Sequence, residues 1–178
     1  MDYTLIRSRR KTIAIQITPQ AEVIVRCPMK MAQEDILRFV EQKQHWIEKH
    51  LSACTPIQPL SSQELRDLAA QAKADLSQRV AHFAPLVGVG CGRSTIRSQR
   101  TRWGSCRGKG NLNFNCLLML APPEIRDYVV VHELCHRLHM DHSPAFWAAV
   151  RQILPDYAVR RAWLKTNGRH LIARLPRA

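Results

Sequence analysis

The feature that most restricts the fold of this chain is the segment Val131-His132-Glu133-Leu134-Cys135-His136, where polar residues interrupt an apolar stretch. Residues four apart on an α-helix project from one face, so the imidazoles of His132 and His136 can meet on one metal ion. Burying two imidazoles and a carboxylate among apolar neighbours is costly unless they have a role. The segment therefore predicts a buried helix that carries a metal site.

Glu133 lies about 100° around such a helix from His132, beside the metal and not on it. From that position its carboxylate can take a proton from a metal-activated water, which makes it the candidate general base. A catalytic zinc site needs three protein ligands and one open position, so a third ligand is expected elsewhere in the chain.

Two histidines are candidates for the third ligand. His139 lies on the same helical face as His132 but about 10 Å along the axis at 1.5 Å per residue, too far while the helix continues. His142 follows Met140-Asp141, where the helix can end and the chain can fold back. Its spacing from His132 and His136 matches the metzincin signature, although those enzymes have glycine where this chain has His139. We therefore predict His132, His136 and His142 as ligands of Zn²⁺.

Composition indicates a globular protein with a basic surface. Hydrophobic residues make up 46% of the 178 residues, enough to bury a core. The formal net charge of +13 favours contact with polyanions, or else reflects a solvated basic surface without a dedicated partner. No membrane-spanning segment or signal peptide is recognisable, so we expect a cytoplasmic protein without a membrane partner. The six cysteines form no C-x-x-C pair and are expected to be reduced and mostly buried.

Hydrophobic periodicity and turn residues predict alternating strands and helices. The expected elements are strands 12–17 and 22–26, a helix over 31–51, a linker over 55–62, a helix over 62–83, a strand over 94–98, a structured loop over 102–110, a strand over 111–116, and helices from 122, over 143–153 and over 156–167. Asp156 is expected to cap the last of these helices.

Several ordered segments carry a resemblance to a known family. They are Arg102-Trp103-Gly104-Ser105-Cys106, Asn113-Phe114-Asn115, Leu120-Ala121-Pro122, the run from Tyr128 to His136, the run from His142 to Trp147, and Pro155-Asp156-Tyr157. Together they resemble the YgjP-like metallopeptidase domain, which is similar to SprT-like and other small zincin groups. The resemblance covers nearly the whole chain and implies the same ligands, His132, His136 and His142, with Glu133 as general base.

The resemblance and the expected elements predict an α+β fold. This is a small zincin-like domain with a mixed or antiparallel sheet packed on the H-E-x-x-H active-site helix, preceded by an N-terminal β-hairpin and helices. Residues 1–55 are expected to form the N-terminal part and residues 62–178 the catalytic domain, with the two parts either separate or packed as one.

Other marked residues have weaker predictions. In zincins generally, a strand edge above the metal pairs with an extended substrate, so Asn113 and Asn115 are candidates for substrate binding or else exposed sheet positions. Trp103 is expected to be a packing anchor and Cys106 a buried structural cysteine. Phe146 and Trp147 are expected in the core, holding the third ligand in place. Tyr157 is a weaker candidate for a hydroxyl that reaches the metal.

Three functions fit these observations. The first is a zinc metallopeptidase that acts on a peptide or protein. The second is a hydrolase of nucleoside triphosphates at the same site, favoured by the arginines around Arg97, Arg100, Arg102 and Arg107, although no G-x-x-x-x-G-K loop is present. The third is a non-enzymatic, basic nucleic-acid-associated zinc module. Its structural zinc site would usually be cysteine-rich and closed, unlike this histidine set.

Overall fold

A computed structural model describes residues 2–107 and 110–176 of the chain. The chain divides into two compact units, Met1–Pro59 and Leu60–Ala178, and each is described by itself. Each unit combines strands with helices, so the α+β class is confirmed. Among the described helices, none combines the length and the apolar character that a bilayer crossing demands.

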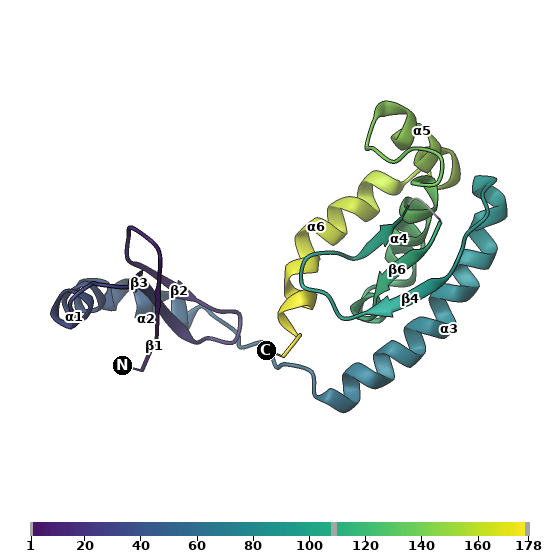
Figure 1. The fold of residues 1–178 in the computed structure, drawn as a ribbon. Coiled ribbons are helices and arrows are strands. Elements are labelled where there is room, and N and C mark those ends of the chain that lie inside the picture. Colours follow the sequence, from purple (N-terminus) through teal and green to yellow (C-terminus); the bar gives the residue numbers. More distant parts are fainter. Residues whose placement is uncertain (1, 108–109, 177–178) are drawn as a thin grey trace. The chain divides into compact units, whose positions relative to one another are not determined.

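The first unit packs two helices on a small mixed sheet. Its elements are β1 (Thr4–Ser8), β2 (Ala14–Ile17), β3 (Val23–Pro28), α1 (Gln33–Gln42) and α2 (Gln44–Ser52). The order is β1-β3-β2, with β1 parallel and β2 antiparallel to β3, so the predicted hairpin is β2–β3 (Figure 1). The core of this unit includes Val25, Ile36 and Ile47.

Two predictions for this unit need correction. Strand β1 lies in a segment for which no strand was expected, and the Arg7 side chain ties it to the carbonyls of Met29 and Met31. The helix expected over 31–51 is broken at Lys43, whose φ of −101° and ψ of 5° end α1 and begin α2. Ile36 of α1 and Ile47 of α2 are both fully buried in the same small core, on either side of the break.

The second unit contains the segment 122–142 that was predicted to hold a metal. Its elements are α3 (Ser62–Val87), β4 (Ser94–Arg97), β5 (Gly104–Cys106), β6 (Leu112–Asn115), the 3₁₀ helix η1 (Cys116–Leu120), α4 (Pro123–Cys135), α5 (Pro144–Ile153) and α6 (Tyr157–Ala173). The sheet order is β4-β6-β5, with β4 parallel and β5 antiparallel to β6, so the sheet is mixed. Strand β5 lies inside the segment expected to be a loop, and it is an edge strand.

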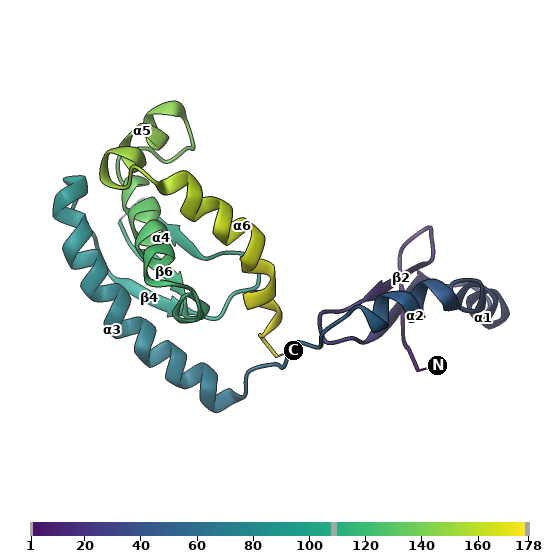
Figure 2. The same ribbon diagram turned by 180° about the vertical axis from the view of Figure 1, so that it is seen from behind.

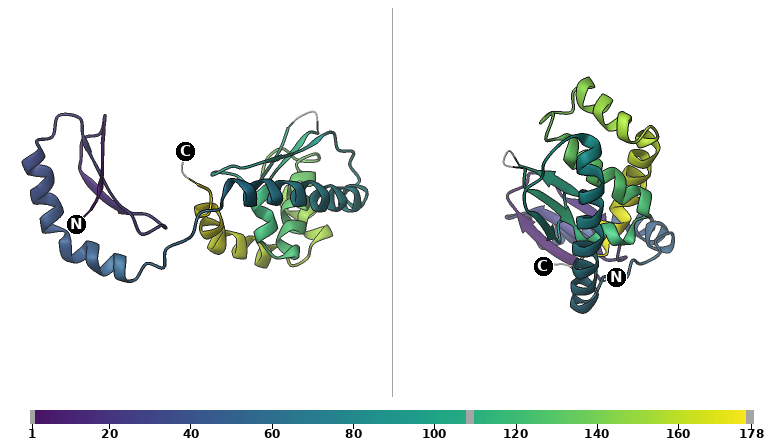
Figure 3. Two further views of the ribbon diagram at one scale, coloured as in Figure 1. Left: turned by 90° about the horizontal axis from the view of Figure 1, so that it is seen from below. Right: turned by 90° about the vertical axis from the view of Figure 1, so that its right-hand side faces the viewer.

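Helix α4 forms the centre of this unit. It lies between α3 and α6, as Figures 1 and 2 show, while the sheet and helices α4 to α6 form two layers alongside α3 (Figure 3). Val130, Val131 and Leu134 of α4 are fully buried, in a core that also takes in Leu76 of α3 and Phe114 of β6. Because apolar residues surround this helix on most sides, its polar residues are held in fixed positions.

Helix α3 has strong signals at both ends. At its start, Ser61 and Glu64 form a reciprocal capping box. At its end, Gly88 adopts a φ of 76°, the left-handed conformation that ends many helices and suits glycine. The helix therefore runs to Val87, four residues beyond the predicted end.

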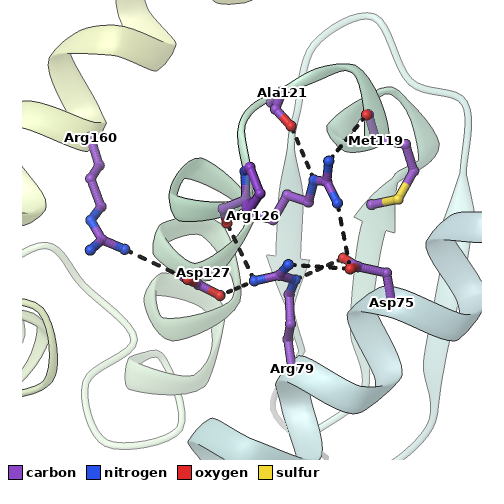
Figure 4. A network of polar contacts seen from close by, with 8 residues as sticks. Asp75, Arg79, Met119, Ala121, Arg126, Asp127 and Arg160 are labelled. Carbon is purple, nitrogen blue, oxygen red and sulfur yellow. Dashed lines mark hydrogen bonds and ion pairs between the residues drawn. The ribbon is translucent and has the colours of Figure 1, made fainter.

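A network of ion pairs joins α3, α4 and α6 (Figure 4). Arg79 of α3 bonds to both Asp75 and Asp127, and Arg126 of α4 pairs with Asp75 at 3.4 Å. Arg160 of α6 pairs with Asp127 at 3.9 Å. Each of these side chains is at most 28% exposed, so the network is screened less than surface pairs and fixes the helices around α4.

Helices α5 and α6 start differently. The Ser143 hydroxyl accepts a hydrogen bond from the N–H of Phe146 and caps α5, as the sequence indicates. Asp156 occupies the cap position of α6, but its side chain caps nothing and instead pairs with Arg160 at 2.9 Å. The predicted side-chain cap at Asp156 is therefore wrong.

Candidate metal centre and active site

The last turn of α4 presents two imidazoles side by side. His132 lies inside the helix and His136 is its C-terminal cap residue, and their ring centroids are 4.8 Å apart. Both rings are partly buried, because apolar residues of α4 occupy the positions between them. The spacing of four residues thus places two nitrogen donors on one face, as predicted.

The chain reverses after α4 and brings His142 back to the same point. The N–H groups of Leu138 and His139 both donate to the carbonyl of Cys135, which tightens the chain into a turn at the end of the helix. The Nε2 atoms of His142 and His132 are 3.1 Å apart. One nitrogen from each of His132, His136 and His142 lies within 4.8 Å of the others. The structure therefore brings the three predicted histidines together.

His139 has a different position from the three. Its backbone carbonyl is 3.0 Å from Nδ1 of His136 and accepts a hydrogen bond from that nitrogen. This bond leaves Nε2 as the His136 nitrogen with a free lone pair, which is the usual arrangement behind a metal-binding histidine. His139 thus orients His136 through its main chain.

Aromatic rings surround the three imidazoles. Phe146 of α5 is fully buried, stacks on His136 at 4.5 Å and meets both His132 and His142 at 4.9 Å. Trp147 stacks on His142 at 5.7 Å. Tyr157 stacks on the far side of Trp147 at 5.3 Å, one ring removed from the histidines. The start of α5 therefore fixes the ring of His142 by contact, in the role predicted for Phe146 and Trp147.

Burial favours the neutral form of His132 and His136. It lowers the pKa of His132 to about 3, and the neighbouring charges of His136 and His142 lower it further in the same direction. Burial also lowers the pKa of His136, against the effect of its bond to the His139 carbonyl. Neutral imidazoles are the form that binds metal, so the rings of His132 and His136 are ready to donate nitrogen lone pairs at neutral pH.

Glu133 is a buried carboxyl group next to the cluster. Its side chain is 5% exposed, and burial raises its pKa to about 8, against the lowering effects of the Cys106 N–H, which donates to it, and of the Arg102 charge. The N–H of Cys106 comes from β5, so the carboxyl group lies between the metal-site helix and the edge strand. A carboxyl with a raised pKa is suited to accept and return a proton near neutral pH.

Gly104 makes this position of Glu133 possible, and the sequence interpretation gave it no role of its own. A Cβ at Gly104 would lie 2.6 Å from Oε1 of Glu133 and 2.7 Å from its Cγ. Only glycine lets β5 approach the carboxyl so closely. In the sequence, this close approach is signalled only by a glycine directly after Trp103. The Trp103 ring itself packs against α6, where a Cβ on Gly168 would lie 3.1 Å from it.

A cleft of about 240 Å³ opens beside Glu133. Its lining comes from the segment before β5, from α4 and from α6: Thr101, Arg102, Trp103, Gly104, Tyr128, Val129, His132, Glu133 and Leu164. Trp103 both packs against α6 and forms one wall. The cleft gives a substrate access to His132 and Glu133 together.

The two asparagines predicted to bind substrate differ in position. Asn113 is partly exposed on β6 and donates from its amide to the Ser105 hydroxyl at 3.2 Å. Asn115 is 1% exposed; its amide nitrogen donates to the carbonyls of Gln99 and Arg102 and its oxygen accepts from the N–H of Leu117. Asn115 therefore holds the loop before β5 in place, and its prediction as a substrate-binding residue is corrected.

All six cysteines are free. Cys27, Cys116 and Cys135 are buried, Cys54 and Cys106 are half-buried, and Cys91 is exposed. Burial raises the pKa of the Cys106 thiol, and the nearby charge of Glu133 raises it further, so this thiol stays protonated. Cys106, expected to be a buried structural cysteine, is thus only half-buried against the core and carries no reactive thiolate.

The donor set fits a divalent metal ion of the zinc type. Three imidazole nitrogens lie within 4.8 Å of one another, two of them 3.1 Å apart, and one of the rings has its tautomer set by a backbone carbonyl. Three protein nitrogens leave a tetrahedral ion one open position, which is the pattern of catalytic rather than structural zinc.

The sequence matches the family model described as YgjP-like, metallopeptidase domain, over residues 11–67 and 62–167. The chain belongs to this YgjP-like family. Its metallopeptidase domain spans both units, and the match includes the three histidines and Glu133. No match is found among curated proteins.

Among solved structures, this YgjP-like chain is similar to the crystal structure of the metallopeptidase zymogen of Pyrococcus abyssi abylysin. The identity is 21% and the TM-score 0.45, over 51% of this chain and 93% of that one. Family membership rests on the family model alone.

Proposed function

We propose that this YgjP-like domain is a zinc-dependent peptidase that uses Glu133 as its general base. The observation that carries the proposal is the meeting of three imidazoles, from His132, His136 and His142, directly beside a buried carboxyl group. A zinc ion bound by these nitrogens would supply a Lewis acid that lowers the pKa of water toward about 7 and polarises a carbonyl group.

Glu133 would handle the proton. A divalent cation beside it favours the carboxylate over the neutral acid, so its high pKa falls when the site is loaded. The carboxylate then accepts the proton of the attacking water, and the acid returns it to the amide nitrogen that leaves. The Cys106 N–H donates to this carboxylate and so holds it beside β5.

The backbone of β5 offers a place for an extended peptide. The Trp103 carbonyl accepts from the Asn115 N–H at 2.8 Å and the Arg107 N–H donates to the Asn111 carbonyl at 3.0 Å, so odd-numbered residues bond to β6. Backbone groups alternate in an antiparallel pair, so those of Gly104 and Cys106 face the other way, toward Glu133. Within the described sheet, that edge of β5 has no strand partner, and its backbone groups other than the Cys106 N–H, which is bonded to Glu133, can pair with substrate main chain.

The test is peptide cleavage by the zinc-loaded protein and its Glu133→Gln variant. We expect the variant to keep stoichiometric zinc and to lose cleavage by about 10²-fold to 10⁴-fold, because only the proton acceptor is removed. The His136→Ala variant is the matched control, since it should lose the zinc itself. Undiminished cleavage by zinc-loaded Glu133→Gln would contradict the proposal.

A second candidate is hydrolysis of a phosphoanhydride at the same site. It is favoured by Arg97, Arg102 and Arg107, which line a cavity next to β5. Release of phosphate from ATP, measured on the same two variants, separates the candidates. Hydrolysis of ATP that is lost in Glu133→Gln, together with intact peptides, would favour this second function.

A further inference from the structure

A second cavity lies against the sheet, apart from the cleft beside Glu133. Its volume is about 430 Å³, and its lining is polar: Arg97, Ser98, Gln99, Arg102, Ser105, Cys106, Arg107 and Asn113. Arg102 lines both this cavity and the cleft, so the two are neighbours. The lining includes three arginines and no aspartate or glutamate.

These three arginines have no ion-pair partner within the described part of the chain, although Arg102 lies close enough to Glu133 to affect its pKa. None of Arg97, Arg102 and Arg107 forms an ion pair there, whereas Arg79, Arg126 and Arg160 of the helix network all do. Like charges gathered around one hollow repel one another, and an anion that enters relieves this repulsion. The cavity is therefore built to receive a negative group.

The sheet relates this cavity to a peptide on β5. Asn113 and Ser105 are register partners, and they share the sheet face opposite to that of the buried Phe114 and its partner Gly104, which touches Glu133. A strand added to the free edge of β5 points alternate side chains to each of these faces. One set then faces Glu133 and α4, and the other set faces the cavity.

We propose that this cavity, which we call the arginine cavity, binds an acidic side chain of the peptide being cleaved. The inference rests on the proposed peptidase function and adds a substrate class to it. Arg97 and Arg107 supply the charge, and the hydroxyl of Ser105 and the amide of Asn113 supply neutral hydrogen-bonding groups on the same face. The enzyme then prefers sites with aspartate or glutamate near the scissile bond.

The experiment reverses the charge of the cavity without touching the cleft. Arg97→Glu/Arg107→Glu is compared with a control, Lys73→Glu/Arg66→Glu, which makes the same change in net charge at exposed positions of α3. Binding of three labelled peptides, matched except for an Asp, Asn or Lys at one position, is measured in the Glu133→Gln background. Cleavage of the same peptides is measured with Glu133 intact.

We expect the parent to bind the Asp peptide about fivefold or more tightly than the Lys peptide, with the preference weakened by salt. The cavity double variant should invert this order, and the α3 control should keep it. Equal binding of the three peptides, or an order that the double variant leaves unchanged, would overturn the inference.

Two results separate this inference from the function on which it rests. Cleavage of all three peptides without a charge preference would overturn the arginine cavity as a specificity site and leave the peptidase intact. Binding that inverts with the cavity charge, without cleavage of any peptide, would keep the site and remove the peptidase function. ATP is tested as a competitor. If ATP displaces the labelled Asp peptide from the parent but not from the cavity double variant, and does so at far lower concentration than an unlabelled Asp peptide, the site binds phosphate and the inference is overturned.

Discussion

In the metal-free protein Glu133 is held as a neutral acid, because its carboxyl group is buried away from solvent. Its pKa is raised to about 8, whereas a carboxyl in an unfolded chain titrates near ~4.3. Between these values the folded state binds more protons than the unfolded state. The protonated Glu133 therefore contributes its full stabilisation at pH values below its pKa in the unfolded chain. This contribution is lost as the pH rises through about 8.

This shift predicts the pH dependence of the metal-free Glu133→Gln variant. Glutamine resembles the neutral acid but cannot ionise. The variant therefore avoids the loss of stability that ionisation of Glu133 causes in the parent at high pH. Between pH ~5.5 and ~8.5 the variant should gain on the order of 3 kcal/mol of unfolding free energy relative to the parent. Chemical denaturation in the presence of a chelator measures this difference. His132, whose pKa of about 3 acts on the acid side, is common to both proteins and cancels.

The second prediction at this scale concerns Gly104. A methyl group there would lie 2.6 Å from Oε1 of Glu133, so in Gly104→Ala the carboxyl group or β5 must move. We expect peptide cleavage to fall by about 10²-fold while zinc content stays at the parent level, because a small misplacement of a catalytic group is costly. Gly90→Ala is the matched control, since nothing lies within 4 Å of its added Cβ. Equal loss in both variants would refute this reading of Gly104.

At the scale of elements, the position of α4 depends on the helices beside it. Arg79 of α3 bonds to Asp75 and Asp127 at once, so its removal leaves two carboxylates close together in a poorly solvated place. We expect Arg79→Ala to lower the free energy of unfolding by about 2 kcal/mol and to leave zinc affinity nearly unchanged. Arg66→Ala, on the exposed part of the same helix, should cost less than about 0.5 kcal/mol. Thermal unfolding of both variants, with zinc titration, makes the comparison.

Elements with a strong local signal were predictable from the sequence. Helix α4 follows from its apolar run and helix α5 from Ser143 and Pro144, so the meeting of His132 and His136 needed no tertiary information. The return of His142 followed from the expected end of the helix near Asp141, although the turn begins earlier, at His136.

The missed elements depend on contacts between distant residues. Strand β5 is three residues long and exists because β6 exchanges backbone hydrogen bonds with it and Glu133 accepts from the Cys106 N–H, which no local pattern reveals. The burial of Asn115 likewise depends on carbonyls of the loop at Gln99 and Arg102. Without knowledge of those partners, the alternation of Asn113 and Asn115 indicated only that both lie on one face.

At the scale of the molecule, the chain has two separate hydrophobic cores. One is built on Val25, Ile36 and Ile47 and the other on residues from Leu60 to Leu175, with no residue in common. The three histidines, Glu133, the cleft and the arginine cavity all belong to residues 60–178. The family match nevertheless includes both units, so the N-terminal unit is part of what defines these proteins.

These cores predict that residues 60–178 fold and bind zinc without the N-terminal unit. The first residues matter: Leu60 is 4% exposed and donates its N–H to the Arg174 carbonyl at 2.7 Å, and Ser61 caps α3. A fragment of residues 62–178 loses both, so we expect it to be about 2–3 kcal/mol less stable than the fragment of residues 60–178. Denaturation followed by the fluorescence of Trp103, Trp147 and Trp163 measures both fragments. We expect a chelator to lower the midpoint of the longer fragment and of the full chain alike. A fragment of residues 60–178 that is unfolded with zinc present would show that the second core needs the first unit, because its own cap, core and metal ligands are then all in place.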